Sequence, residues 1–372
     1  YNLIFSNNFL DINWNKYDSS RFPLHYFITK LYLPLDYNII KLNNFILSLL
    51  IPIILFLSLQ KKINNLQINH YVYLIIAQSF IIYLSPYLRT SAYWMLEENF
   101  GIFFLVISSY FLFSVLSVSN NHKLLKILTN LFFIYCAFFC SQNLFVFVII
   151  NFLFLITFFW RNKLYILFII ILNCFFLFAP VFFFYDVFFQ IFNNISSARV
   201  DFEINNIVDF FSILSIYLLP VCIVCFTRDE FLHFYKKYYY LIIVCIFVFF
   251  YLFWSYESDV LAGGAIKKIL LFIFDQNSFF KFFYISSSFL GLLLTVQLIK
   301  DKEFKIIFFV VPYLIFIIFS NYVFQEYLDP LVLIYFMIYT KLLDSLREKQ
   351  ILFLYSYFFL FLVSANIYYT IL

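Results

Sequence analysis

Long, nearly uninterrupted apolar stretches constrain this chain more than any other feature. About twelve stretches approach the length needed to cross a bilayer, and most carry no charged side chain. A segment in lipid has to satisfy its own backbone N–H and C=O groups, which a helix does internally. A transmembrane barrel would instead show short alternating segments. We therefore expect an all-α fold, a polytopic bundle of transmembrane helices.

The composition excludes a soluble domain and a disordered chain. Of 372 residues, 65% are hydrophobic and 12% are charged, whereas a soluble domain carries about 25% charge. The net charge of +4 is spread over many loops, so it predicts no nucleic-acid partner.

The expected spans divide the whole chain, without a linker or an internal repeat, so 1–372 is predicted to be one integral membrane domain. The chain opens with Tyr1 and no signal peptide, so we expect a fragment, with about 12 spans here and about 13 in the full chain. Residues 1–38 are interpreted as the remnant of a first outer loop with an interfacial helix. The spans are expected at 42–59, 71–87, 100–118, 125–140, 144–160, 164–185, 207–226, 238–255, 282–299, 306–322, 330–343 and 351–371.

Basic residues set the expected orientation. Most of the 24 lysines and arginines fall in alternate short loops, and such loops are cytoplasmic in multi-pass proteins. The remaining loops are then outer, and they collect carboxylates and the isolated Arg21 and Arg89. We therefore expect any chemistry on the outer face. The cytoplasmic loops are those with Lys61 and Lys62; Lys123 and Lys126; Arg161 and Lys163; Arg228, Lys236 and Lys237; Lys300, Lys302 and Lys305; Lys341, Arg347 and Lys349.

The first outer segment of interest runs from Asp18 to Tyr26. Pro23 suits the start of a helix, and Arg21 and His25 have the i, i+4 spacing of one helix face. An interfacial helix anchored by Arg and Tyr would explain the segment equally well.

The second segment, 85–99, holds Arg89 close to Glu97 and Glu98. Charges this near hydrocarbon usually pair or line a wet cavity, and Arg fits a phosphate through its planar fork. A functional role is favoured over a simple Arg89–Glu98 tether, because Ser85, Arg89, Trp94 and Glu98 crowd one turn.

The third segment, 321–330, contains Gln325, Tyr327 and Asp329. Pro330 can begin a helix, and Asp329 would then cap that helix at its positive end. Capping is the preferred interpretation of Asp329, whereas Gln325 and Tyr327 have no such structural role.

Other polar residues are expected to be structural. Asp209 is interpreted as a solvated helix end. Lys267 and Lys268 are assigned to a re-entrant or interfacial helix, with lysines that face outward and could meet lipid phosphates. The Cys222 and Cys225 pair lacks further ligands, so neither a metal nor a cofactor is predicted.

Together the three segments resemble those of the type-C glycosyltransferases, integral membrane enzymes that use dolichyl- or polyprenyl-phosphate sugars. The segment from Arg21 to Tyr26 is similar to a Pro-Pro-Leu-Tyr-Tyr region of that superfamily. The stretch from Arg89 to Gly101 resembles its second outer loop, and Gln325 to Pro330 resembles a late outer loop of its bacterial, family-39-like members. The resemblance covers most of the chain in topology, but only about 35 residues in sequence motifs.

The resemblance implies sugar transfer from a polyprenyl-phosphate carrier to a lipid, glycan or protein acceptor, with inversion, at the outer face of the bacterial plasma membrane. Its catalytic acid would lie at or before Tyr1, which leaves Asp11, Asp18 and Glu98 as the acids to consider here. Arg21 and Arg89 become phosphate or acceptor contacts. The other residues expected to bind substrate are His25, Glu97, Gln325 and Tyr327.

Three alternatives remain open. A secondary transporter would show repeats and ionisable residues at the midplane, but the charges here lie mostly in loops. An enzyme that joins lipid-linked glycans would carry a large outer loop with several arginines, yet 256–281 has none. The third alternative is a non-catalytic membrane scaffold.

Overall fold

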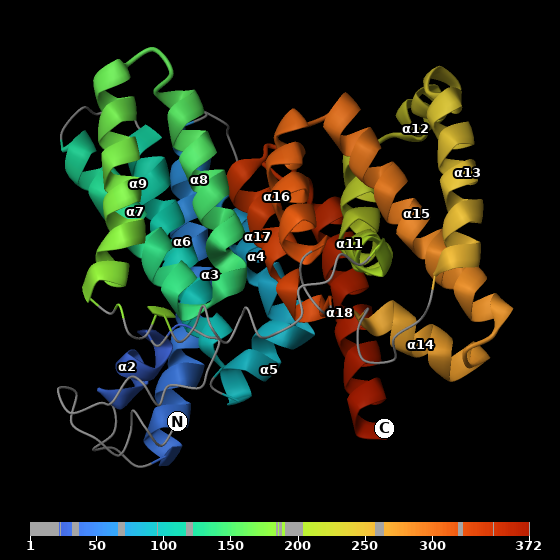
Figure 1. Ribbon diagram of the computed structural model, residues 1–372, viewed down its shortest axis with the longest axis horizontal. Coiled ribbons are helices and arrows are strands. Elements are labelled where there is room, and N and C mark those ends of the chain that lie inside the picture. Colours follow the sequence, from blue (N-terminus) through green and yellow to red (C-terminus); the bar gives the residue numbers. More distant parts are fainter. Residues whose placement is uncertain are drawn as a thin grey trace. The chain divides into compact units, whose positions relative to one another are not determined.

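The fold was analysed in a computed structural model (Figure 1). The structure describes Phe22, 24–31, 37–65, 71–94, 96–116, 122–183, Tyr185, 188–189, 204–256, 264–318, 323–344 and 346–371. These residues are helical apart from short turns, and they contain no strand. The all-α expectation is therefore confirmed.

The contacts divide the chain into two compact units, which are described separately. The first unit comprises 1–83 and 88–199, and the second comprises 84–87 and 200–372. Whether both belong to one membrane domain, as the sequence predicts, stays a prediction.

The first unit is built around α6. Helices α3 (Tyr37–Asn65), α6 (Glu97–Leu116) and α7 (Lys123–Cys140) make its most extensive contacts. Buried amides join these apolar helices: Asn99 Nδ2 donates to Asn44 Oδ1 at 2.9 Å, and Asn130 Nδ2 donates to the Ser108 carbonyl at 2.8 Å. Such bonds stabilise helix pairs where the hydrophobic effect is weak. Its other helices are α2 (Leu24–Lys30), α4 (Val72–Phe80), η3 (Ile81–Leu84, of which Leu84 is in the second unit), η4 (Gln142–Leu144), α8 (Phe145–Phe158) and α9 (Lys163–Phe183).

The second unit surrounds α11 (Ile204–Cys225), a mostly buried helix. Helix α15 (Ser278–Asp301) packs along it, and α14, α16, α17 and α18 also contact it. The remaining elements are α12 (Arg228–Lys237), α13 (Tyr239–Ser255), α14 (Gly264–Phe274), η5 (Phe304–Ile306), α16 (Ile307–Ile318), η6 (Gln325–Tyr327), α17 (Leu331–Tyr339) and α18 (Glu348–Ile371).

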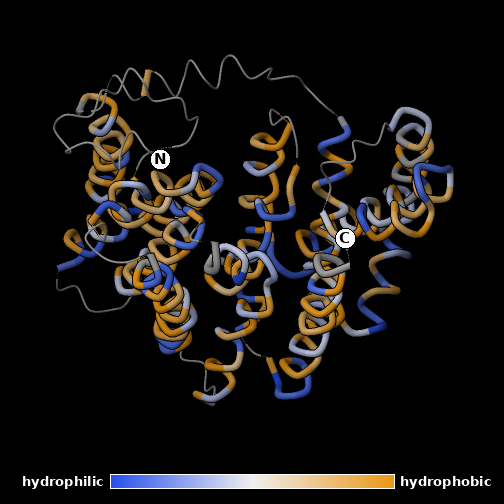
Figure 2. Tube along the Cα trace, turned by 90° about the horizontal axis from the view of Figure 1, so that it is seen from below, coloured by the Kyte–Doolittle hydropathy of each residue, from blue (hydrophilic) through white to orange (hydrophobic). Residues whose placement is uncertain are grey.

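Seven described helices are long and apolar enough to cross a membrane: those in α3, α6, α7, α9, α11, α15 and α18. The other expected spans correspond to shorter apolar helices, so a count of twelve stays a prediction. Figure 2 shows that hydrophobic residues dominate the helices, whereas hydrophilic residues gather at many helix ends.

Two expected spans differ from continuous membrane helices. The stretch 71–87 is divided into α4, η3 and then α5 (Pro86–Trp94). The division falls at Ser85 because a residue before proline avoids helical backbone, whereas Pro86 suits a first helical position. Helix α17 has 9 residues, a rise of about 14 Å. It is shorter than a bilayer core because Thr340 ends it in an extended conformation.

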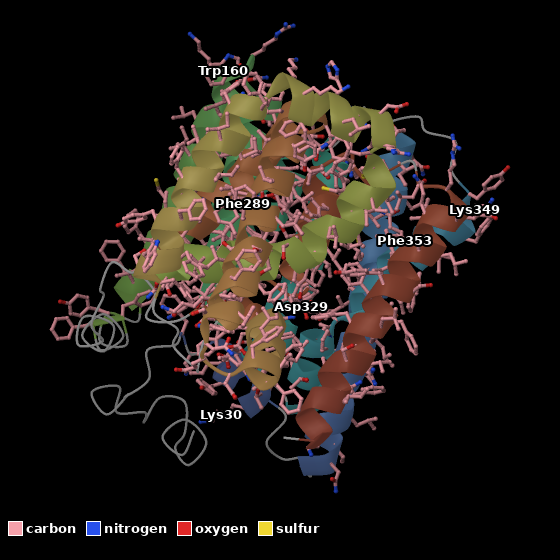
Figure 3. All side chains as sticks on the ribbon, turned by 90° about the vertical axis from the view of Figure 1, so that its right-hand side faces the viewer. Lys30, Trp160, Phe289, Asp329, Lys349 and Phe353 are labelled. Carbon is pink, nitrogen blue, oxygen red and sulfur yellow. The ribbon has the colours of Figure 1, made fainter. Side chains whose placement is uncertain are left out.

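Three loops with the same expected side lie together in the second unit. In the second unit, Lys302 Nζ lies 2.8 Å from Glu230 Oε1, and the Lys341 N–H donates to Glu303 at 3.2 Å. These contacts join three loops that the charge pattern placed on one side. In the first unit, Lys30 and Trp160 lie at opposite ends (Figure 3). Which side faces the cytoplasm stays a prediction.

Gly291 allows α15 to approach α11 closely. A Cβ atom at this position would lie 2.0 Å from the backbone oxygen of Phe211. Backbone cannot rotate aside as a side chain can, so any larger residue would separate the helices.

We therefore expect Gly291→Ala to lower the free energy of unfolding by about 1–3 kcal/mol, the usual cost of overpacking. The measurement is reversible unfolding in detergent. Gly101→Ala is the matched control, because its Cβ would meet the flexible end of Leu144 at 2.6 Å and should cost less. An equal or smaller cost at Gly291 would contradict this packing.

Candidate functional site

A buried carboxylate, Asp329, lies in the second unit just before α17. Its side chain is 1% exposed, and Oδ2 accepts a hydrogen bond from the Tyr87 N–H at 3.4 Å. Tyr87 is 242 residues away in the sequence, so the contact joins two of the three segments singled out above. Figure 3 shows Asp329 among the helices, away from Lys349 at the start of α18.

Asp329 is placed at the start of a helix, but of a different helix from the one expected. Pro330 is the N-cap residue of α17, and no side chain caps that helix. The carboxylate instead accepts from the first turn of α5, where the helix dipole also favours negative charge. The capping interpretation was therefore wrong about the partner, because the cap comes from a distant loop.

The surroundings of Asp329 favour its protonated form. Burial raises the pKa of Asp329 to about 7, while hydrogen bonds from Ser85, the Tyr87 N–H and Tyr217 lower it. Loss of hydration therefore outweighs the hydrogen bonds. A carboxyl group with a pKa near neutrality can exchange a proton under physiological conditions.

Gln325 connects this carboxylate to α14. Its amide Nε2 donates to the Tyr217 hydroxyl at 3.1 Å, and its Oε1 accepts from the Ala265 N–H at 2.9 Å. Gly264, with φ of +70°, brings the helix start close enough for this bond. Gln325 therefore anchors the first turn of α14 to α11.

The predicted site residue Tyr327 is half-buried, with its ring 5.7 Å from that of Phe324.

A buried ion pair forms the second anchor of α14. Asp209 Oδ2 lies 3.5 Å from Lys267 Nζ, and both residues are nearly inaccessible to solvent. Asp209 Oδ1 also accepts from the hydroxyls of Tyr284 at 2.6 Å and Tyr256 at 3.1 Å. These bonds meet the requirement that a buried charge be both paired and hydrogen-bonded.

Two interpretations of this region were therefore wrong. Asp209 is not a solvated helix end, because α11 begins before it, its side chain is buried, and Tyr256, just after α13, and Tyr284 of α15 donate to it. Lys267 does not face outward, since its ammonium group turns inward to Asp209. Lys268 remains half-buried on the same helix.

Arg89 stands apart from the other predicted residues that the structure describes in the first unit. Its side chain is exposed and forms no ion pair with any described residue, so the alternative interpretation, a tether to Glu98, is not seen. Glu97 and Glu98 are half-buried in the first turn of α6, where the helix dipole favours carboxylates. His25 is 2% exposed and stacks on Phe100, with 5.4 Å between ring centroids.

Asp11, Asp18 and Arg21 lie outside the described residues, as does Pro23. The helix that contains His25 begins at Leu24. The expected helix face shared by Arg21 and His25 therefore stays a prediction.

Sequence reasoning missed most of the buried network. It expected no structural role for Gln325, whereas both ends of its amide join α14 to α11, and it assigned no role to Tyr217, Tyr256 or Tyr284. Asp209 carried one usable signal, since it lies inside an expected apolar span (207–226), where an ionisable residue requires a partner.

We expect Asp329→Asn to remove a pH dependence of stability. The native pKa of Asp329, about 7, is above its ordinary value of 3.8, so the folded state holds this proton more tightly than the unfolded state does. The contribution of this proton to the free energy of unfolding is fully present below about pH 3.8 and is lost as pH rises to about 7. Between pH 5 and 7 the wild type should lose about 2 kcal/mol relative to the variant.

The measurement is unfolding in detergent at several pH values. Glu326→Gln is the matched control, because it changes a carboxylate in the same loop that is half-buried. A difference between wild type and Asp329→Asn that does not change with pH would contradict the assignment.

Comparisons with known proteins add no name to this site. No family model matches the chain, and no curated protein or solved structure is detectably similar to it. The functional argument therefore depends on the residues and their geometry.

Proposed function

We propose that this chain is a membrane glycosyltransferase that moves a sugar from a polyprenyl-phosphate carrier to a lipid, glycan or protein acceptor on the outer face of a bacterial plasma membrane. One observation carries the proposal: the Asp329–Tyr87 hydrogen bond joins the late loop that resembles type-C glycosyltransferases to the turn just before Arg89, where the second such stretch begins. Their proximity supports a shared role, because nothing in local sequence requires it.

Charge distribution also supports the proposal. Acidic side chains and the isolated Arg89 belong to the loops expected outside, whereas the basic loops meet at the other end of the second unit. Transfer from a lipid phosphate needs both kinds of group: a carboxylate to accept a proton and a cation to stabilise the departing phosphate.

The chemistry would be a single displacement. The acceptor hydroxyl loses its proton to a carboxylate as its oxygen forms a bond to the anomeric carbon. The bond from that carbon to the phosphate oxygen breaks, and the polyprenyl phosphate leaves with the electron pair. Asp11, Asp18 and Glu98 are the candidate acids, and Arg21 and Arg89 are the candidate phosphate contacts.

Asp329 is assigned a positioning role in this scheme. It is too buried to reach a substrate without rearrangement, yet it holds the first turn of α5. Arg89 follows in the same helix, so Asp329 would hold the helix start from which Arg89 extends.

We expect Arg89→Ala and Glu98→Ala each to lower transfer at least about 100-fold, the range for a lost charge stabiliser or acid–base group. Membranes that contain the protein are incubated with undecaprenyl phosphate carrying a radiolabelled hexose or pentose, and labelled acceptor is counted. Arg228→Ala and Asp229→Ala are matched controls, since both residues are exposed in α12. Full turnover in both test variants would overturn the site assignment.

Secondary transport is a second candidate because of the Asp209–Lys267 pair. An ionisable pair inside a helix bundle is typical of ion and proton pathways, and the sequence had indicated that charges were confined to loops. The first proposal is preferred because the pair is hydrogen-bonded to the hydroxyls of Tyr256 and Tyr284 and anchors α14.

The two candidates predict different behaviour in proteoliposomes. Transport predicts solute uptake driven by a proton or sodium gradient, and Asp209→Asn should abolish it. Glycosyl transfer predicts sugar transfer that does not depend on an ion gradient. Asp209→Asn should then lower this activity only by destabilising the fold. Gradient-driven uptake that Asp209→Asn abolishes would replace the first proposal.

A further inference from the structure

A cavity of about 260 Å³ lies in the second unit at the end where the basic loops meet. Its walls come from the ends of α11, α15 and the loop before α18. The lining residues are Val224, Cys225, Lys302, Glu303, Lys341, Leu342, Leu346 and Gln350.

The charges of the cavity fit a singly charged anion. Two lysines and one glutamate line it, and Glu230 outside the lining pairs with one of the lysines, so Lys341 is the cation that can compensate a bound anion. Lys302 already pairs with Glu230 at 2.8 Å, but an ammonium group has three donors and so retains capacity. Lys341 is exposed, and its ammonium makes no ion pair with a described residue.

The other polar groups of the cavity are already engaged. Gln350 donates to the Val224 carbonyl at 2.8 Å and accepts from the Arg347 N–H at 2.8 Å. Glu303 accepts from the Lys341 N–H at 3.2 Å. These bonds fix the walls and leave the two lysine ammonium groups as the donors available to an anion.

Apolar side chains also line the cavity. Val224, Leu342 and Leu346 form part of its wall. A free phosphate would use none of this surface, whereas the glycerol and acyl chains of a lipid would cover it.

We propose that this cavity binds the phosphodiester headgroup of an anionic membrane lipid, with Lys302 and Lys341 as its donors. A phosphodiester carries one negative charge, which the Lys341 ammonium can compensate while Lys302 donates a further hydrogen bond. The expected cytoplasmic side of these loops agrees with the proposal, because anionic lipids there attract basic segments.

Native mass spectrometry of the detergent-purified protein tests this proposal with three probes: phosphatidylglycerol, phosphatidylcholine and inorganic phosphate. Phosphatidylglycerol should bind most tightly. Lys302→Gln and Lys341→Gln should each weaken its apparent affinity roughly fivefold, the contribution of one basic residue near anionic lipid.

Two variants serve as controls. Lys236→Gln removes an exposed lysine from the same end but outside the cavity, and it should leave affinity unchanged. Glu230→Gln breaks the bridge to Lys302 while keeping that lysine, so affinity should be retained or increased. Unfolding midpoints measured without lipid show whether each variant folds.

Three results would overturn the proposal. One is equal weakening by Lys236→Gln, which would indicate a diffuse surface effect. Another is equally tight binding of phosphatidylcholine, which would remove the requirement for net negative charge. The third is equal occupancy by inorganic phosphate, which would make the ligand a free anion rather than a lipid.

Discussion

The second unit depends on the need to compensate charge that is buried among apolar helices. An unpaired carboxylate beside α11 would be costly, because hydration is lost and apolar side chains offer no hydrogen bonds. Asp209 meets this requirement with Lys267 and two tyrosine hydroxyls. Asp329 meets it with Ser85, the Tyr87 N–H and Tyr217. Each solution requires groups from distant parts of the chain, so it also fixes the positions of loops and short helices.

Helix α14 connects the two carboxylates. The first turn of α14 donates to Gln325, and Gln325 donates to Tyr217 of α11. Lys267 of α14 pairs with Asp209, which also lies on α11. The loops of the second unit that are expected outside are therefore positioned by polar contacts. At the opposite end, exposed lysines and carboxylates form looser contacts around an open cavity. Buried polar contacts thus hold one end of this unit in place, whereas the other end keeps exposed charged side chains that a ligand can contact.

The sequence was sufficient for the helical class and for the placement of most helices, because apolar runs such as 100–118 and 207–226 are long and solid. It placed α17 but not its short length, since Thr340 gives no clear stop signal. The site was harder to predict. Asp329 was correctly located at a helix start, but local sequence could not show that the helix was α5. Lys267 was assigned outward because its partner lies on another helix, and pattern analysis within one segment does not include such partners.

Sidedness is the claim on which both proposals depend, and cysteine labelling tests it most directly. Gln276→Cys and Lys236→Cys place a thiol at exposed positions at the two ends of the second unit. With a membrane-impermeant maleimide on intact cells, and the wild type as baseline, we expect labelling at position 276 and none at 236 until the membrane is opened. The reverse pattern would place the Asp329 loop in the cytoplasm and contradict outer-face sugar transfer.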